Sequence, residues 1–255
     1  MILECVIVCV DYSDFLSQTI VHNRTHFDKM VVVTNLKDKN TKKICDFYNV
    51  ECIQTNVFYD NGAVFNKANG INAGLDKLKK DDWVLQLDAD IALTPLTRII
   101  LEKLPLDKTC IYGVDRYMCH SFEDWQDFLL SPTPIHSGWV FVNPAIPNFS
   151  LGYRLSQYFG EGYQPIGFFQ LWNPKKSKIL TYPNEHGAAD RTDVLFCKLW
   201  KPEYRRFIPD FCVIHLESEH SPMAKNWNGR VSAPFKHKTL KDLKEIQIAI
   251  HDNKY

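Results

Sequence analysis

The clearest indication of fold is the stretch Asp82-Trp-Val-Leu-Gln-Leu-Asp-Ala-Asp-Ile-Ala-Leu-Thr-Pro95. Its run from Trp83 to Leu87 is almost continuously apolar, which predicts a short strand buried in a parallel sheet. The run ends on Asp88 and Asp90, and side chains two positions apart in an extended segment project to the same side. Because open α/β sheets bind ligands at the carboxyl ends of their strands, these two carboxylates predict a ligand site.

Two carboxylates this close repel each other unless a cation lies between them. Hard oxygen ligands suit Mg²⁺ or Mn²⁺, which would carry a substrate phosphate. Aspartate is also common in turns, so a solvated turn at the strand end is an equal alternative for the pair taken alone.

The composition is that of a soluble globular protein. The chain has 255 residues, of which 45% are hydrophobic and 24% charged, enough for one large domain. Lysine plus arginine and aspartate plus glutamate each number 30, so no overall charge favours a nucleic-acid or anionic-membrane partner.

The eight cysteines are scattered through apolar runs without a C-x-x-C or zinc spacing. They are predicted to be buried free thiols of a reducing compartment, which indicates a cytoplasmic protein. The apolar start, from Ile2 to Val10, contains Glu4 and lacks a basic leader and a cleavage site, so we interpret it as a strand. No run is long enough to span a bilayer.

Strand-like and helix-like patterns alternate along the first half. Strands are predicted at 5–10, 30–34, 51–55 and 109–114, with helical patterns after the first strand and at 40–48. This alternation predicts an α/β, doubly wound, mostly parallel sheet in a single domain. Ligand groups should follow the strands, which selects Asp11, Tyr12, Thr34 and Asn35, although ordinary turn chemistry also explains them.

A further signal lies just before the acidic strand. The segment from Phe65 to Leu75 opens a helix, so Lys67 and the first-turn amides lie near a helix amino terminus, a natural place for a diphosphate. Gly70 and Gly74 would allow close helix packing. A lone lysine on a helix is usually solvated, but this one stands among asparagines and ahead of the D-x-D strand.

The segment from Phe65 to Pro95 resembles the donor half of a GT-A glycosyltransferase, in particular the family-2-like inverting enzymes. The shared pattern is a lysine followed by Asn-x-Gly-Leu, then a strand ending in Asp-Ala-Asp with a proline shortly after. The resemblance implies a nucleotide-sugar donor across the strand ends and a divalent metal, Mn²⁺ or Mg²⁺, on its diphosphate. The donor-binding positions it implies are Val10, Asp11, Tyr12, Thr34, Asn35, Lys67, Asn72, Asp88 and Ala89, with Asp88 and Asp90 at the metal.

The second half would supply the rest of the site. Ser137 and Gly138 resemble a turn that lines the donor sugar, though a simple turn explains them nearly as well. Asp115-Arg116 is either a charge pair near the cleft or a surface pair. The alternating residues Phe168, Gln170 and Trp172 would hold an acceptor sugar or pack in the core.

Three further assignments follow from the same resemblance. Inverting GT-A enzymes place a general base ahead of a helix, which selects Asp193, with Asp190 as the alternative; an N-cap role is also open. His215, after the last strand, would be a third metal ligand, with His220 as the second choice, although a histidine at a strand end is usually structural. Arg230 would belong to a loop that closes over the diphosphate.

The expected organisation is a donor half at 1–112, an acceptor and catalytic half at 113–235 and a terminal helix at 236–255. The expected function is metal-dependent transfer of a sugar, from a UDP sugar, to a hydroxyl acceptor with inversion. The basic run from Lys175 to Lys178 and the cluster of Arg230, Lys236, Lys238 and Lys241 leave open a glycosyltransferase acting on hydroxymethylated DNA bases. A sugar nucleotidyltransferase and a non-catalytic sugar-binding module are also open.

Overall fold

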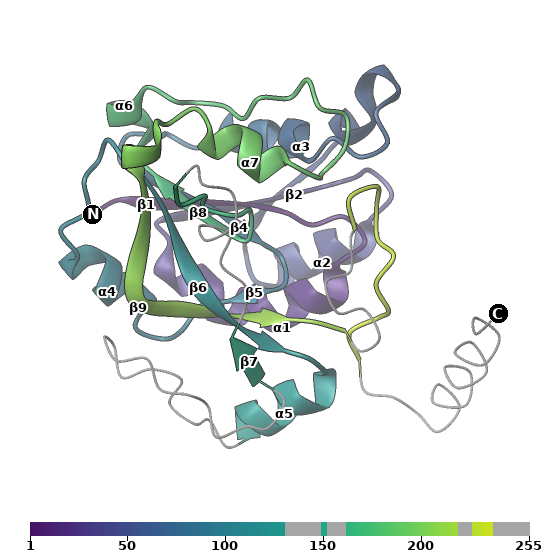
Figure 1. The fold of residues 1–255 in the computed structure, drawn as a ribbon. Helices are drawn as coiled ribbons and strands as arrows, with labels where there is room; N and C mark the ends of the chain where they lie inside the picture. Colours follow the sequence, from purple (N-terminus) through teal and green to yellow (C-terminus); the bar gives the residue numbers. More distant parts are fainter. Residues whose placement is uncertain (131–148, 152–161, 219–225, 237–255) are drawn as a thin grey trace, which may run out of the picture.

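The computed structural model describes residues 1–130, 149–151, 162–218 and 226–236 (Figure 1). The strands are β1 (Leu3–Val8), β2 (Lys29–Thr34), β3 (Glu51–Gln54), β4 (Trp83–Asp88), β5 (Ile91–Ala92), β6 (Ile111–Cys119), β7 (Phe149–Leu151), β8 (Phe169–Trp172) and β9 (Arg205–Leu216). The α-helices are α1 (Ser13–Asn23), α2 (Lys39–Phe47), α3 (Lys67–Leu75), α4 (Thr97–Lys103), α5 (Phe122–Leu130), α6 (Pro174–Ser177) and α7 (Thr192–Cys197). The predictions for Ser137, Gly138, His220 and the helix at 236–255 fall outside the described residues, apart from position 236.

All these strands belong to one sheet with the order β3-β2-β1-β4-β8-β6-β9-β5, and β7 pairs with β6. Strands β3, β2, β1 and β4 are mutually parallel, as the alternation of strands and helices predicts. Strand β8 is antiparallel to both β4 and β6, and β9 is parallel to β6. The predicted single-domain α/β, Rossmann-like architecture is confirmed, and the sheet runs without a break from the first half of the chain into the second.

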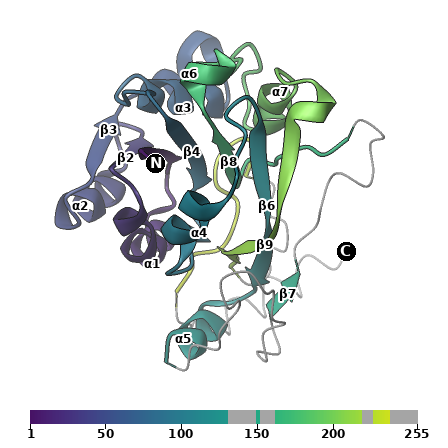
Figure 2. The ribbon, with the colours of Figure 1, turned by 90° about the vertical axis from the view of Figure 1, so that its left-hand side faces the viewer.

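Helices cover both faces of the sheet (Figures 1 and 2). One apolar core joins the sheet to α1, α2 and α4, and a second joins it to α3 and α7. The four-strand parallel part is apolar because both of its faces are covered, which explains the continuous run from Trp83 to Leu87.

Helix α3 packs closely on β1 and β2 because Gly74 has no side chain. A Cβ added there would lie 2.3 Å from Val6 Cγ2 and 2.9 Å from Val33 Cγ2, both on fully buried side chains. The Asn66 side chain caps the helix by accepting from Asn69 N at 3.1 Å. These two contacts fix the position of Lys67, the first helical residue.

Strand β6 extends past the predicted end at position 114. A β-bulge between Gly113 and Asp115 lets β6 continue along β9 to Cys119. Arg116 lies in this extension, and its side chain is partly buried. All eight cysteines are free, as predicted, and seven of them are buried. The described residues contain no helix of the length and apolarity that crossing a membrane requires.

Candidate active site

A cavity of about 290 Å³ opens at the carboxyl ends of β1 and β4. Both halves of the chain line it, as expected for a donor site shared between strand ends. The lining residues with a bearing on its chemistry are Val10, Tyr12, Lys67, Gln86, Asp88, Ala89, Asp90, Arg116, Phe168, Gln170, Tyr182, Asp190, Asp193, His215 and Arg230.

Lys67 and Asp88 form an ion pair at the floor of the cavity. Lys67 Nζ lies 2.6 Å from Asp88 Oδ1, and Gln86 Nε2 donates to the same oxygen at 3.0 Å. Burial, the largest effect, raises the pKa of the Asp88 carboxyl; Lys67 partly opposes this and the neighbouring charge of Asp90 adds to it. For Lys67, burial lowers the pKa of the ammonium, but Asp88 outweighs it and the net pKa is raised.

Asp90 is paired with His215, which comes from the far end of the chain. Strand β5 is antiparallel to β9 with Ile91 opposite His215, and Leu216 N donates to Asp90 O at 2.9 Å. This register brings His215 Nε2 to 3.3 Å from Asp90 Oδ2. Burial raises the pKa of Asp90, but the interactions with His215 outweigh it and the net pKa is lowered.

The Asp90 and His215 pair fits a divalent cation. Asp90 Oδ1 is buried and has no hydrogen-bond partner among the described residues, as a carboxylate oxygen reserved for a cation would be. The expected three-ligand set is not assembled, since the described residues contain no converging group of three or more His, Cys, Asp or Glu. Asp88 Oδ1 is instead engaged by Lys67 and Gln86.

Arg116 contacts the other side of the His215 ring. Arg116 Nη1 lies 2.8 Å from His215 Nδ1, and its guanidinium carbon lies 4.6 Å from the centre of the Phe168 ring. Because arginine only donates hydrogen bonds, Nδ1 accepts here and Nε2 carries the proton facing Asp90. Metal coordination through Nε2 would need the other tautomer and the loss of the Arg116 contact. Burial, the largest effect, lowers the pKa of Arg116.

Both candidate bases line the cavity, but they have different partners. Asp193, in α7, accepts from Gly167 N at 2.7 Å through Oδ2 and from Val194 N at 2.8 Å through Oδ1. Asp190 Oδ1 instead lies 2.8 Å from His186 Nε2. Asp193 is close enough to Lys67 for its charge to help raise the pKa of that ammonium, after the larger effects of burial and Asp88. Asp193 therefore belongs to the same electrostatic cluster as the floor of the cavity.

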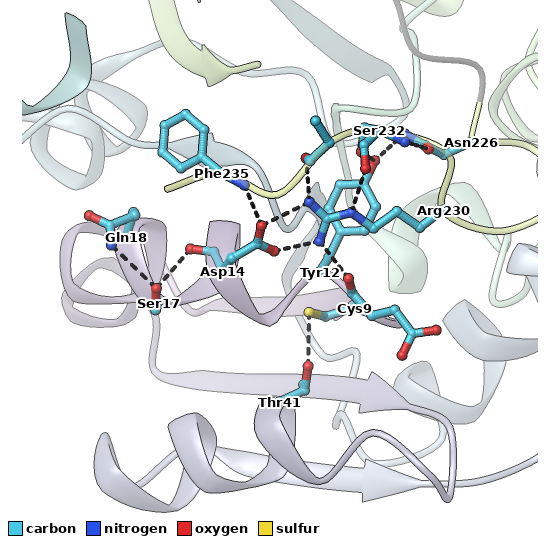
Figure 3. A network of polar contacts seen from close by, with 12 residues as sticks. Cys9, Tyr12, Asp14, Ser17, Gln18, Thr41, Asn226, Arg230, Ser232 and Phe235 are labelled. Carbon is cyan, nitrogen blue, oxygen red and sulfur yellow. Dashed lines mark hydrogen bonds and ion pairs between the residues drawn. The ribbon is translucent and has the colours of Figure 1, made fainter. Parts of the chain in front are cut away.

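Arg230 lines the cavity as expected, but all five of its N–H donors are already used (Figure 3). Nη1 donates to Asp11 O and to Asp14 Oδ1, both at 2.6 Å. Nη2 donates to Asp14 Oδ2 and Ala233 O, both at 2.8 Å, and Nε donates to Ser232 O at 3.2 Å. Arg230 thus holds the segment 226–236 against α1 and has no donor left for a diphosphate.

Three predicted donor contacts do not line the cavity. Thr34 Oγ1 donates to Asp38 Oδ2 at 3.1 Å, and Asn35 Oδ1 accepts from Lys37 N and Asp38 N, both at 2.8 Å. Both side chains shape the turn after β2, which is the ordinary turn chemistry left open for them. Asp11 has a left-handed φ of 58° at the turn into α1, and it is not among the lining residues.

Two further predicted contacts are structural. Asn72 bonds both polar backbone groups of Tyr182, from Nδ2 to the carbonyl at 2.9 Å and from the backbone N–H to Oδ1 at 2.7 Å. Trp172 is fully buried in the second core and donates from Nε1 to Ile179 O at 3.0 Å. Neither side chain lines the cavity, so the acceptor role expected of Trp172 is wrong.

The other two residues of that alternating set do line the cavity. Phe168 packs beneath Arg116, and Gln170 has both ends of its amide occupied. Gln170 Nε2 donates to Asp193 O at 3.1 Å, and Gln170 Oε1 accepts from Tyr182 Oη at 2.7 Å. Gln170 is therefore placed to support Asp193.

Three residues of the cavity have roles that the sequence patterns do not predict. Of the three, only Gln86 gives a sequence signal that could have pointed to the site, because it is a polar residue in the middle of a buried apolar strand. Arg116 is visible as a charge, but the bulge that directs it inward is not visible in the pattern. Tyr182 lies in an irregular segment, and only the packing against α3 shows its position.

No protein-family model and no curated protein matches this chain. Solved structures do resemble it. A mycobacterial protein has a TM-score of 0.51 and 11% identity, over 88% of this chain and 69% of its own.

Glucosyl-3-phosphoglycerate synthase from Mycobacterium tuberculosis, solved with Mn²⁺, UDP and glucosyl-3-phosphoglycerate, has a TM-score of 0.47 and 11% identity, over 98% and 77% of the two chains. The bifunctional glycosyltransferase WbbM has a TM-score of 0.45 and 16% identity, over 82% of this chain and only 39% of its own. At these identities the likeness concerns the fold.

Proposed function

We propose that this protein is a metal-dependent glycosyltransferase that moves a sugar from a nucleotide diphosphate sugar, with UDP as the nucleotide, to a hydroxyl acceptor with inversion. The observation that carries the proposal is the convergence of the Lys67–Asp88 pair, the Asp90–His215 pair and Asp193 on one cavity at the strand ends. A sugar-binding module would not need an acid with a free buried oxygen together with a separate carboxylate.

The donor would lie across the ends of β1 and β4. Val10, Tyr12 and Ala89 line this part of the cavity and are the proposed contacts of the nucleoside. Lys67 would donate to the diphosphate. Mn²⁺ or Mg²⁺ would be held by Asp90 and His215, with Asp88 nearby, and when bound it offsets negative charge on the leaving diphosphate.

The proposed general base is Asp193. Its carboxylate faces the cavity and is oriented by the backbone N–H groups of Gly167 and Val194. It would accept the proton of the acceptor hydroxyl as that oxygen attacks the anomeric carbon from the face opposite the diphosphate. Asp190, whose Oδ1 lies 2.8 Å from His186 Nε2, remains the alternative base. In this scheme the half at 1–112 binds most of the donor, and the half at 113–235 binds the acceptor and supplies the catalytic residues.

Nucleotidyl transfer and a DNA acceptor have less support from the site. Strand β1 is followed by Val10, Asp11 and Tyr12, where a nucleotidyltransferase would be expected to carry a glycine-rich phosphate loop. Of the basic residues that suggested a DNA acceptor, those from Lys175 to Lys178 lie around α6 and do not line the cavity, and Lys175 is 3.4 Å from Asp81. In the second basic cluster, Arg230 lines the cavity but is paired with Asp14, and Lys238 and Lys241 lie outside the described residues. The buried free thiols fit the cytoplasmic location that we propose.

The test is turnover of nucleotide sugars by the wild-type chain and by Asp193→Asn. Incubation with a panel of nucleotide sugars and Mn²⁺ should show slow donor hydrolysis by the wild type. Asp193→Asn should lower turnover by about a hundredfold or more, the usual contribution of a general base, while calorimetry shows nearly unchanged UDP binding. Asp190→Asn is the matched control and should retain most activity. Normal turnover by Asp193→Asn would remove Asp193 from the mechanism.

A further inference from the structure

Arg116 differs from the other cations of the cavity in having no carboxylate partner among the described residues. Lys67 is paired with Asp88 at 2.6 Å, and Arg230 is paired with Asp14 at 2.6 Å. Arg191 lies 4.0 Å from Asp190 and its side chain is 75% exposed, so solvent stabilises its charge. Within the part of the chain that the structure describes, Arg116 forms its one hydrogen bond with the ring of His215.

The hydrogen-bonding capacity of Arg116 is therefore mostly unused. A guanidinium group has five N–H donors, of which the contact with His215 occupies one. Its Nε is buried without any partner in the described ranges. Buried polar groups are almost always satisfied, and a buried N–H donor without an acceptor is costly. This arrangement is what an anion-binding arginine presents before its ligand arrives.

The position of Arg116 indicates which anion would bind. Arg116 projects from β6 to the same face as His215 on β9, since its register partner Val213 is two residues before His215. The His215 ring lies between Arg116 and Asp90, so the guanidinium group is one side chain away from the proposed cation site. Phe168 packs against the guanidinium group and limits its movement.

We infer that Arg116 is an anion-binding residue of this cavity and that its ligand is the diphosphate of the donor. Arginine binds phosphate oxygens through pairs of parallel N–H donors, and the unused donors of Arg116 provide such a pair. The identity of the anion rests on the proposed function. The assignment replaces Arg230, whose donors are all occupied, by a residue on strand β6.

The first experiment uses calorimetry to measure binding of inorganic pyrophosphate without metal. The affinity measured in this way depends on neither the nucleobase nor catalysis. The wild type should bind pyrophosphate, and Arg116→Met should bind it about tenfold more weakly or worse, the fold-change expected for losing a hydrogen-bonded charge. Arg191→Met removes the same charge from the edge of the same cavity and should change the affinity less than about twofold, as exposed charges do. Arg116→Lys keeps the positive charge but lacks the paired N–H donors of a guanidinium group. Its affinity for pyrophosphate should lie between those of the wild type and Arg116→Met.

Several results would overturn the inference. These are a wild type that does not bind pyrophosphate, an Arg116→Met variant that binds it as well as the wild type, or an equal loss in the Arg116 and Arg191 variants. Thermal unfolding of each variant would show that the fold is retained, and the lysine variant provides the comparison if Arg116→Met does not fold.

The second experiment repeats the comparison with UDP. Weaker UDP binding by Arg116→Met supports the assignment to the donor diphosphate. An unchanged UDP affinity overturns it and would move the anion to the acceptor. If pyrophosphate binding depends on Arg116 but no nucleotide sugar is turned over by the wild type, the anion site stands and the proposed transferase function is wrong.

Discussion

Replacing Lys67 with methionine should destabilise the protein, and the loss should grow with pH. Among the described residues, Lys67 is the cation bonded directly to Asp88, at 2.6 Å. In the variant, the amide of Gln86, at 3.0 Å, is the side-chain donor that this carboxylate still has. Methionine keeps most of the side-chain volume and removes the charge. The variant therefore leaves a largely buried carboxylate without its counter-ion, which is among the costly single changes in a protein.

The size of the loss follows from the exposure of the pair and from the pKa of Asp88. Removing one partner of a fully buried ion pair costs about 3–5 kcal/mol, and the 18% and 26% exposure of these two side chains places the expectation near the lower end, at about 3 kcal/mol at pH 7. Protonation of Asp88 sets an upper limit on this loss of stability, because the variant can take up a proton instead of keeping the buried charge. Measured from the ordinary carboxyl pKa of 3.8, holding that proton costs about 4 kcal/mol at pH 7 but only about 1.6 kcal/mol at pH 5.

The direction of the pH dependence is fixed by linkage. The pKa of Asp88 is already raised in the folded protein, so its proton favours folding at low pH and stability falls as pH rises through the folded pKa. Loss of Lys67 raises that pKa further, because Lys67 lowers it in the wild type. The difference between variant and wild type should therefore be larger at pH 7 than at pH 5.

Urea unfolding followed by tryptophan fluorescence, with a chelator present at both pH values, measures these free energies. The matched control is the double variant Lys67→Met with Asp88→Asn, which removes both charges and should recover at least half of the loss at pH 7. The reasoning is refuted if Lys67→Met loses the same free energy at pH 5 and pH 7, or if the double variant is no more stable than the single one.

Two other substitutions test the supports of the cavity. Gly74→Ala should cost about 1–2 kcal/mol of stability, because overpacking against Val6 outweighs the gain in helix propensity, whereas Gly187→Ala, whose new Cβ would meet its nearest neighbour at 3.4 Å, should change the urea midpoint little. Arg230→Met should speed hydrogen exchange around Asp14 without weakening pyrophosphate binding; a loss of pyrophosphate affinity as large as in the Arg116 variant would contradict the structural role of Arg230.

Much of the fold could be predicted because the first four strands of the parallel half are locally encoded. Continuous apolar runs separated by amphipathic segments specify a parallel sheet covered on both faces, and the strands at 3–8, 29–34, 51–54 and 83–88 lie where those runs predict them. The D-x-D strand and the lysine at the start of α3 also reach one cavity as predicted, because both lie at the carboxyl edge of the sheet.

The pairing of distant side chains required the tertiary structure. Asp90 and His215 are 3.3 Å apart only because β5 pairs antiparallel with β9, a contact that no local pattern specifies. The roles of Arg116 and Arg230 also required the tertiary structure. The sequence shows that each carries a guanidinium group, but not how many acceptors surround that group. The chain itself thus determined the layered α/β sheet and the acidic strand end. The folded structure decided that Arg230 is occupied and Arg116 is left with unused donors, because hydrogen-bond satisfaction depends on neighbours far apart in the chain.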